Sequence, residues 1–233
     1  MPLITLPNKS NRTFDKSLTV EELASDISPS LAKAAIAAKI DGKLVDASES
    51  IVKDCKVEIL TSKDPEGLEV LRHSCAHLLA HALKQLYPEV KLAIGPVIED
   101  GFYYDINLEK SITDDDLKRI EKRMELLAKK KYQIVREIVT RKKALDVFKS
   151  RSEPYKLEII KEIPKDEIIA LYHHEEYIDM CRGPHLTSTK FLNFFKLMKV
   201  SGSYWKGDSK NQQLQRIYGT AWDTKDNLKS YLH

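Results

Sequence analysis

The chain has 233 residues, of which 42% are hydrophobic and 31% are charged, and its formal net charge is +3. This composition excludes an intrinsically disordered protein, and the length is enough to bury one large core or two smaller ones. No apolar run approaches the ~20 residues of a membrane-spanning helix, and the near balance of charge permits a local nucleic-acid-binding patch without requiring one.

The first 62 residues are predicted to form a small ubiquitin-like unit. Short strands are expected at residues 3–6, 12–14 and 56–60. Thr19 and Glu22 have the spacing of a capping box that opens a helix. Asp41-Gly42, between two apolar runs, is a strong hairpin signal. A polar, turn-rich segment then places a domain boundary after residue 62.

A long amphipathic helix is predicted from Pro65 to Tyr87. Its apolar residues recur at steps of three and four, which marks one buried stripe. Histidines four residues apart form a second stripe, roughly 200° around the helix from the first: His73, His77 and His81. Such a helix suits the wall of a polar cleft, and the alternative is a solvated helix with exposed histidines.

The remaining pattern predicts an α+β unit. Strands are expected at residues 134–139, 194–204 and 213–218, and as a pair within 91–106 that is kinked at Asp100-Gly101. Helices are expected at residues 113–131, 142–150 and 153–163, and from about 223. Lys156 lies near a helix start, where the dipole disfavours a cation. It is therefore either an ordinary surface residue or held there for chemistry.

A second polar cluster follows apolar runs at residues 168–171 and 177–178. Asp179, Cys181 and His185 lie there around a Gly-Pro turn. The HxxxH pair of the helix and this CxxxH pair suit either a tetrahedral zinc site or a metal-free hydrolytic cleft. The helix pair lacks the Glu of the HExxH motif, which supplies the general base of metalloproteases.

The three cysteines indicate a reducing compartment. Cys55, Cys75 and Cys181 are too few and too scattered for a disulfide framework. The first residues carry no charged and apolar regions of the kind that make a signal peptide. We therefore expect a cytoplasmic protein.

Five motifs stand out along the chain: HSCAH at 73–77, GPVIEDGFYYD at 95–105, EPYK at 153–156, YIDMCRGPH at 177–185 and QRIYGTAW at 215–222. Together they resemble the N-terminal region of bacterial threonyl-tRNA synthetases. The resemblance covers the whole chain. It implies a β-grasp TGS domain at 1–62, then a larger α+β editing domain at 63–224 with the histidine helix against an antiparallel sheet, and the start of a linker helix at 225–233.

The resemblance also implies a site and a reaction. In that family the editing domain hydrolyses seryl-tRNA(Thr) made in error, by water attack and without a metal. The family's positions fall on His73, Lys156 and Asp179 as catalytic residues, and on His77, Tyr104, Cys181 and His185 as substrate-binding residues. Among these, Asp179 and His185 are expected to read the seryl group, and Tyr104 and His77 to lie near the terminal adenosine.

The resemblance further implies which parts and partners lie outside this chain. The partner is the tRNA(Thr) acceptor end carrying a seryl ester, and no membrane is involved. A class II core, with ATP and zinc, would follow His233 and attach threonine to tRNA. The complete protein is expected to be a homodimer, and this chain is expected to have no cofactor. Whether this chain alone is a monomer stays open.

The small difference between serine and threonine creates the need for a second site, apart from the one that attaches threonine. Serine lacks one methyl of threonine, and a missing methylene is worth only ~1–3 kcal/mol in a pocket that must admit the larger side chain. A separate pocket can discriminate by steric exclusion of the larger group. Two other interpretations stay open: a zinc-stabilised module that binds metal through His73, His77, Cys181 and His185, and a non-catalytic module that binds the tRNA acceptor.

Overall fold

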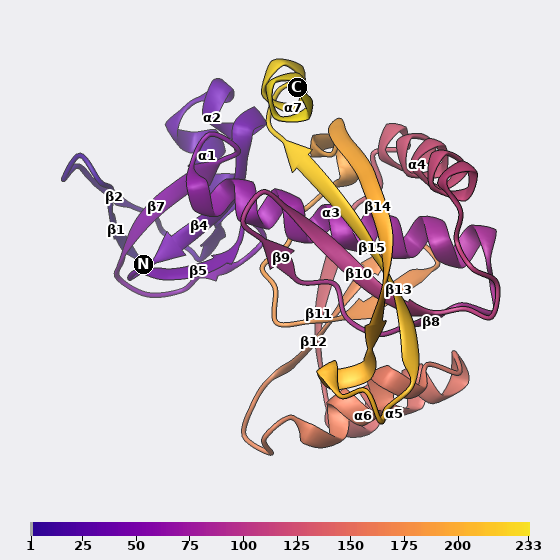
Figure 1. The fold of residues 1–233 in the computed structure, drawn as a ribbon. Helices are drawn as coiled ribbons and strands as arrows, with labels where there is room; N and C mark the ends of the chain where they lie inside the picture. The colour runs from indigo at the N-terminus through magenta and orange to yellow at the C-terminus, as the bar shows by residue number, and fades with distance from the viewer. Residues whose placement is uncertain (1) are drawn as a thin grey trace. The chain divides into compact units, whose positions relative to one another are not determined.

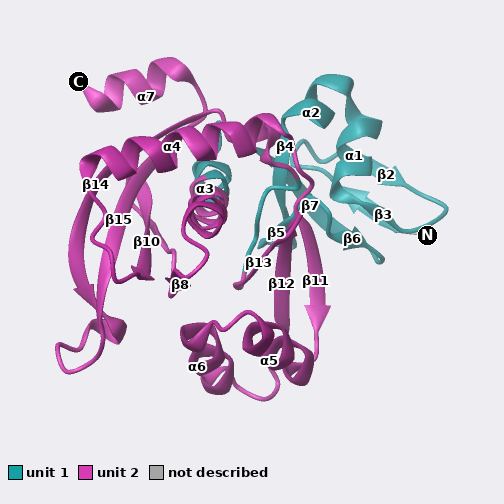
Figure 2. Cartoon of the chain, turned by 90° about the vertical axis from the view of Figure 1, so that its right-hand side faces the viewer, with its two compact units in different colours: residues 1–71, 183–187 teal, residues 72–182, 188–233 magenta. Residues whose placement is uncertain are grey.

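The computed structural model describes residues 2–233 (Figure 1). The chain divides into two compact units, coloured separately in Figure 2. The first unit comprises the residues up to Leu71 together with 183–187, and the second comprises 72–182 and 188–233. The predicted boundaries after residues 62 and 224 remain predictions.

The first unit is a β-grasp-like sheet with a helix, as predicted. Its sheet has the order β2-β1-β7-β4-β5, in which β1 runs parallel to β7 and the other pairs are antiparallel. The strands are β1 (Leu3–Thr5), β2 (Asn11–Thr13), β3 (Leu18–Thr19), β4 (Ala35–Ile40), β5 (Lys43–Asp46), β6 (Ser50–Ile51) and β7 (Cys55–Thr61), and the helices are α1 (Val20–Ile27) and α2 (Pro29–Ala34).

Local signals in this unit act as predicted. Thr19 caps α1 with a complete capping box to Glu22. Asp41 and Gly42 both have positive φ, at 49° and 82°, which is the backbone of a tight hairpin turn between β4 and β5. The core of the unit is formed by apolar side chains of the sheet and α1, including Ile4, Leu23, Ala38 and Val57.

The second unit is built around α3 (Pro65–Leu86), whose first residues belong to the first unit. One antiparallel sheet has the order β14-β15-β10-β8, with β9 paired to β10, and the other has the order β11-β12-β13. Figure 2 shows α3 passing between these sheets. His77 and His81 are buried along with Cys75 and Leu78. The alternative of a solvated helix is therefore wrong, because sheets cover both sides of the helix.

The segment 91–106 differs from the predicted pair of strands. It forms β8 (Lys91–Leu92), β9 (Val97–Ile98) and β10 (Gly101–Asn107), so Asp100 belongs to the turn between β9 and β10 and Gly101 is the first residue of β10. A Cβ atom on Gly101 would lie 2.1 Å from the Gly219 carbonyl oxygen of the neighbouring β15. The glycine therefore serves close strand packing and not a kink within one strand.

The other elements follow the predicted order. They are α4 (Asp114–Lys129), β11 (Val135–Val139), α5 (Arg141–Ser150), α6 (Pro154–Glu162), β12 (Ile169–His174), β13 (Tyr177–Met180), η1 (Thr189–Phe191), β14 (Phe194–Tyr204), η2 (Trp205–Gly207), β15 (Gln213–Trp222) and α7 (Lys225–Leu232). Helices α5 and α6 pack on β12 and β13 through Phe148, Ile160 and Leu171. Among residues 2–233, no helix combines the length and apolar character that spanning a membrane requires.

Candidate functional site

A cavity of ≈ 430 Å³ lies within the second unit. Its polar wall carries six of the seven predicted site residues: His73, His77, Tyr104, Lys156, Asp179 and Cys181. They come from α3, β10, α6 and the end of β13. The lining also includes apolar residues, among them Ile94, Ile159 and Ile168. The cavity can therefore hold a small polar group against an apolar surround.

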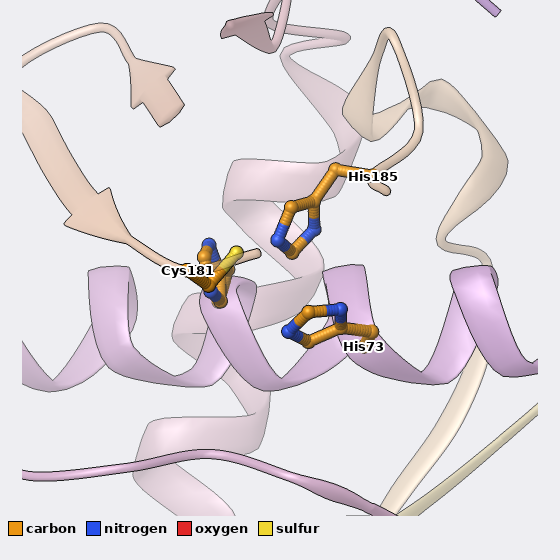
Figure 3. A group of neighbouring side chains, drawn as sticks. His73, Cys181 and His185 are labelled. Carbon is orange, nitrogen blue, oxygen red and sulfur yellow. The ribbon is translucent and has the colours of Figure 1, made fainter. Parts of the chain in front are cut away.

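His185, the seventh predicted residue, belongs to the segment 183–187, which groups with the first unit. Its backbone N–H donates a hydrogen bond to Asp46 Oδ1 of that unit at 2.6 Å. Its side chain is drawn in Figure 3. The prediction that it reads the seryl group stays a prediction.

Asp179 is the centre of the polar wall. Its Oδ2 accepts hydrogen bonds from the hydroxyls of Tyr104 and Tyr177, each at 2.7 Å. Its Oδ1 lies 2.5 Å from Lys156 Nζ and accepts from the backbone N–H of Met180 at 2.7 Å. Both oxygens are thus engaged by fixed donors, so the carboxylate is held in one orientation and has little capacity left for a ligand.

Lys156 shows why a cation occupies the first turn of α6. Its side chain is only 5% exposed, and that of its partner Asp179 is 1% exposed. Lys156 Nζ also donates to the Tyr104 hydroxyl at 3.1 Å. The ammonium has three donors, and these two contacts leave one for a ligand. The unfavourable helix position is therefore offset by a buried ion pair, and the alternative of an ordinary surface residue is wrong.

The ion pair determines the charge of Asp179. Burial alone would raise the pKa of this carboxyl group, but the charge and hydrogen bond of Lys156, followed by the hydrogen bonds of Tyr104 and Tyr177, outweigh burial and lower it. Asp179 is therefore ionised at neutral pH. Burial, together with the charge and hydrogen bond of Asp179, keeps the pKa of Tyr104 well above its usual value, so the phenol remains a donor.

The two cavity histidines have different surroundings. His73 is partly exposed, and its ring centroid lies 5.4 Å from that of His77. His77 is buried, with Nε2 3.5 Å from Asp179 Oδ2. Burial, and then the charges of His73, His174 and Lys156, lower the pKa of His77 well below its usual value. His77 is therefore neutral at pH 7, and His73 is the histidine with access to a ligand.

Nitrogen and sulfur donors also meet at this wall. Figure 3 shows His73 projecting from α3 and Cys181 directly after the end of β13. One donor atom from each of His73, His77 and Cys181 lies within 4.8 Å of the others. Such donors suit zinc by type. The ammonium of Lys156, whose charge acts on His77, opposes a divalent cation at the same wall.

Sequence reasoning missed two buried residues beside the site, Tyr177 and His174. Alternate residues of a strand face the same side, so Tyr177 shares the inward face of β13 with Asp179. The strand register pairs Tyr177 with His174 and Asp179 with Tyr172. Period-two alternation around Asp179 is therefore the signal that would have found Tyr177. Finding His174 requires knowing how β12 pairs with β13.

Gly95 of the 95–105 motif has a direct role in the cavity wall. A Cβ atom there would lie 2.4 Å from Cδ2 of the Tyr104 ring. Only glycine lets this segment of backbone lie against Tyr104, which keeps the Tyr104 hydroxyl aimed at Asp179.

Comparisons with known proteins match both units. Residues 3–61 match the TGS domain, and residues 169–218 match the threonyl and alanyl tRNA synthetase second additional domain. The chain is also similar to threonine--tRNA ligase of Prochlorococcus marinus (strain MIT 9211), with 59% identity over all 233 residues. The match covers 36% of that relative, so the chain spans about a third of its length.

Proposed function

Because the chain belongs to the threonyl-tRNA synthetase family, of which it carries the TGS and second additional domains, we propose that its second unit hydrolyses tRNA(Thr) mischarged with serine. The observation that carries this proposal is the buried cluster of Lys156, Tyr104 and Asp179 at the wall of the cavity, beside His73. Fixed donors beside a titratable imidazole are what water attack on an ester requires.

Each group at the wall has a distinct proposed task. His73 positions the attacking water and accepts its proton. The remaining Lys156 N–H stabilises the oxyanion that forms on the ester carbonyl. Asp179 is a positioning residue that holds Lys156 and Tyr104, because both of its oxygens are already engaged. Cys181 lines the pocket, since an activated ester needs no protein nucleophile.

The step balances without a co-reactant. Water adds to the carbonyl carbon, and the bond from that carbon to the ribose oxygen breaks. One water proton reaches the ribose oxygen, and the other stays with the acid until the acid ionises. The products at neutral pH are free serine, the tRNA hydroxyl and one proton.

Selectivity tests this function most directly. The chain is expected to deacylate seryl-tRNA(Thr) and to spare threonyl-tRNA(Thr), because a cavity that fits serine clashes with one more methyl group. A clash can cost more than a lost contact gains, so the ratio of kcat/KM should exceed roughly 100-fold. Release of each labelled amino acid from the two esters measures it. Equal hydrolysis of both, or of neither at high protein concentration, would contradict the proposal.

We propose that this hydrolysis needs no metal. A zinc-stabilised module is the second candidate, since His73, His77 and Cys181 bring their donor atoms together. Against it, Lys156 already supplies positive charge at the wall, and His77 lies beside its carboxylate partner. We expect less than about 0.1 zinc per chain by elemental analysis, and activity unchanged by EDTA. About one zinc per chain, with activity lost on chelation, would favour the second candidate.

For the longer proteins of the family we propose attachment of threonine to tRNA(Thr) with ATP, a zinc-bearing core and a homodimer, in the cytoplasm. For this chain the proposed partner is the acceptor end of seryl-tRNA(Thr).

A further inference from the structure

Two tyrosines lie on the uncovered face of the sheet β14-β15-β10 in the second unit. Figures 1 and 2 show α3 on one side of this sheet and, within the described part of the unit, no helix over the middle of its other side. Tyr104 faces the cavity beside α3, so its neighbour Tyr103 lies on that other side. Tyr103 and Tyr218 are partly exposed partners in the strand register, with ring centroids 5.8 Å apart. Such a pair offers a surface on which flat groups stack.

A cation lies over each of the two rings. The guanidinium carbon of Arg216 lies 3.8 Å from the centroid of the Tyr103 ring, and Lys199 Nζ lies 5.1 Å from that of the Tyr218 ring. Lys199 is exposed and forms no ion pair among residues 2–233. Aromatic rings that stack on bases, beside cations that contact phosphates, are typical of surfaces that bind single-stranded nucleic acids.

Asp105 holds the guanidinium of Arg216 in place. Arg216 Nε and Nη2 donate to the two carboxylate oxygens of Asp105 at 2.7 and 2.8 Å, and Ser203 Oγ donates to Oδ1 at 3.2 Å. The Asp105 side chain is 3% exposed and that of Arg216 is 25% exposed. Because desolvation offsets much of the attraction in a buried ion pair, orientation explains this pair better than stability. The planar guanidinium is fixed against Tyr103, and its other N–H groups are left for a ligand.

One rim of the cavity borders this face. Ile94 and Pro96 belong to the cavity lining, and Ile94 is 38% exposed. The Pro96 carbonyl accepts a hydrogen bond from the backbone N–H of Tyr103 at 3.2 Å. The segment 94–96 therefore runs along the edge of β10, with Tyr104 on the cavity side and Tyr103 on the outer side. A nucleotide chain that leaves the cavity over this segment reaches Tyr103.

We propose that the tyrosine face, made of Tyr103, Tyr218, Arg216 and Lys199, binds the unpaired nucleotides that precede the terminal adenosine of the tRNA acceptor strand. This inference rests on the proposed function, which places the esterified adenosine in the cavity. Unpaired bases stack on the Tyr103–Arg216 pair and on Tyr218, and Lys199 contacts a phosphate. A duplex fits the face less well, because its base faces are already stacked on one another and one lysine neutralises few of its phosphates.

The first test measures binding of an unesterified RNA single strand ending in CCA to the whole chain, by fluorescence anisotropy. Tyr103→Leu keeps apolar bulk but removes the aromatic ring, so Kd should rise by roughly 10-fold, as expected for one lost base stack. KM for seryl-tRNA(Thr) should rise by a similar factor. Tyr103→Phe keeps the ring and should bind as wild type. Tyr204→Leu changes a 42% exposed tyrosine of β14 outside the tyrosine face and should leave Kd unchanged.

Lys199→Gln tests the phosphate contact on an exposed side chain, whose replacement leaves the core intact. The slope of log K against log salt concentration should become shallower by about 0.7, the value for one phosphate contact with a single strand. Lys210→Gln, at an exposed lysine of the loop before β15, is the matched control and should keep the wild-type slope. Unfolding midpoints show whether each variant folds.

The proposal would be overturned by a folded Tyr103→Leu that binds as wild type, by an equal loss in Tyr204→Leu, or by a blunt RNA duplex that binds as tightly as the single strand. If Tyr103→Leu does not fold, an unchanged salt slope in Lys199→Gln overturns it instead. Hydrolysis of seryl-tRNA(Thr) with no effect of these variants would sink the tyrosine face and leave the proposed function standing. Single-strand binding through the tyrosine face without hydrolysis would do the reverse.

Discussion

Lys156→Met is expected to abolish detectable hydrolysis and to lower the free energy of unfolding by about 3–5 kcal/mol. The variant removes the cation from a buried pair whose side chains are 5% and 1% exposed. Asp179 would then be left charged and buried, and the donor proposed for the oxyanion would be gone. Urea unfolding at pH 7.5, together with release of serine from seryl-tRNA(Thr), measures both effects.

The pH dependence of this loss has a defined sign. In wild type the pKa of Asp179 is lowered, so its contribution to stability is present above its unfolded value and is lost as pH falls. Without Lys156, burial dominates and raises the pKa of Asp179, so the variant takes up a proton earlier. The difference in stability between wild type and Lys156→Met should therefore shrink as pH falls from 7.5 to 5.

Two further variants distinguish the effect of the buried charge on stability from the role of Lys156 in hydrolysis. Lys156→Met/Asp179→Asn should recover part of the lost stability, because no buried charge is left alone, but it should remain inactive. Lys161→Met, an exposed residue of the same helix, should change neither property measurably. A loss below about 1 kcal/mol for Lys156→Met, or hydrolysis within twofold of wild type, would show that the pair has neither role.

His73→Ala should lower kcat/KM for seryl-tRNA(Thr) by roughly 10²-fold or more, as expected when a group in proton transfer is removed. The fold should persist, because His73 is partly exposed and lies off the leucine stripe of α3. Single-turnover kinetics and an unfolding curve measure the two properties. His173→Ala is the matched control outside the cavity and should retain activity.

Cys181→Ser, measured in the same experiment, tests whether Cys181 acts as a nucleophile. If Cys181 only lines the cavity, its replacement should be much milder than His73→Ala. A trapped acyl-cysteine, or a loss equal to that of His73→Ala, would mean that the mechanism runs through the sulfur. Hydrolysis near the wild-type rate in His73→Ala would remove His73 from the proposed catalytic role.

Much of the fold could be predicted because its signals are local. The capping box at Thr19 and Glu22, the hairpin at Asp41-Gly42 and the periodic apolar stripe of α3 act between residues a few positions apart. The same holds for the order of helices and strands in the second unit. The resemblance carried by five motifs then supplied the predicted site residues, six of which line one cavity.

Other features depend on contacts between distant residues and have no local signal. Lys156 near a helix start looks unfavourable until the register of β12 and β13 brings Asp179 to within 2.5 Å of it. The role of Gly101 in strand packing depends on β15, more than a hundred residues away. The burial of His174 without a partner likewise follows from helix α3 and two strands meeting at one place. Patterns along the chain determine which elements form, whereas the charge and exposure of a side chain depend on what the folded chain brings beside it.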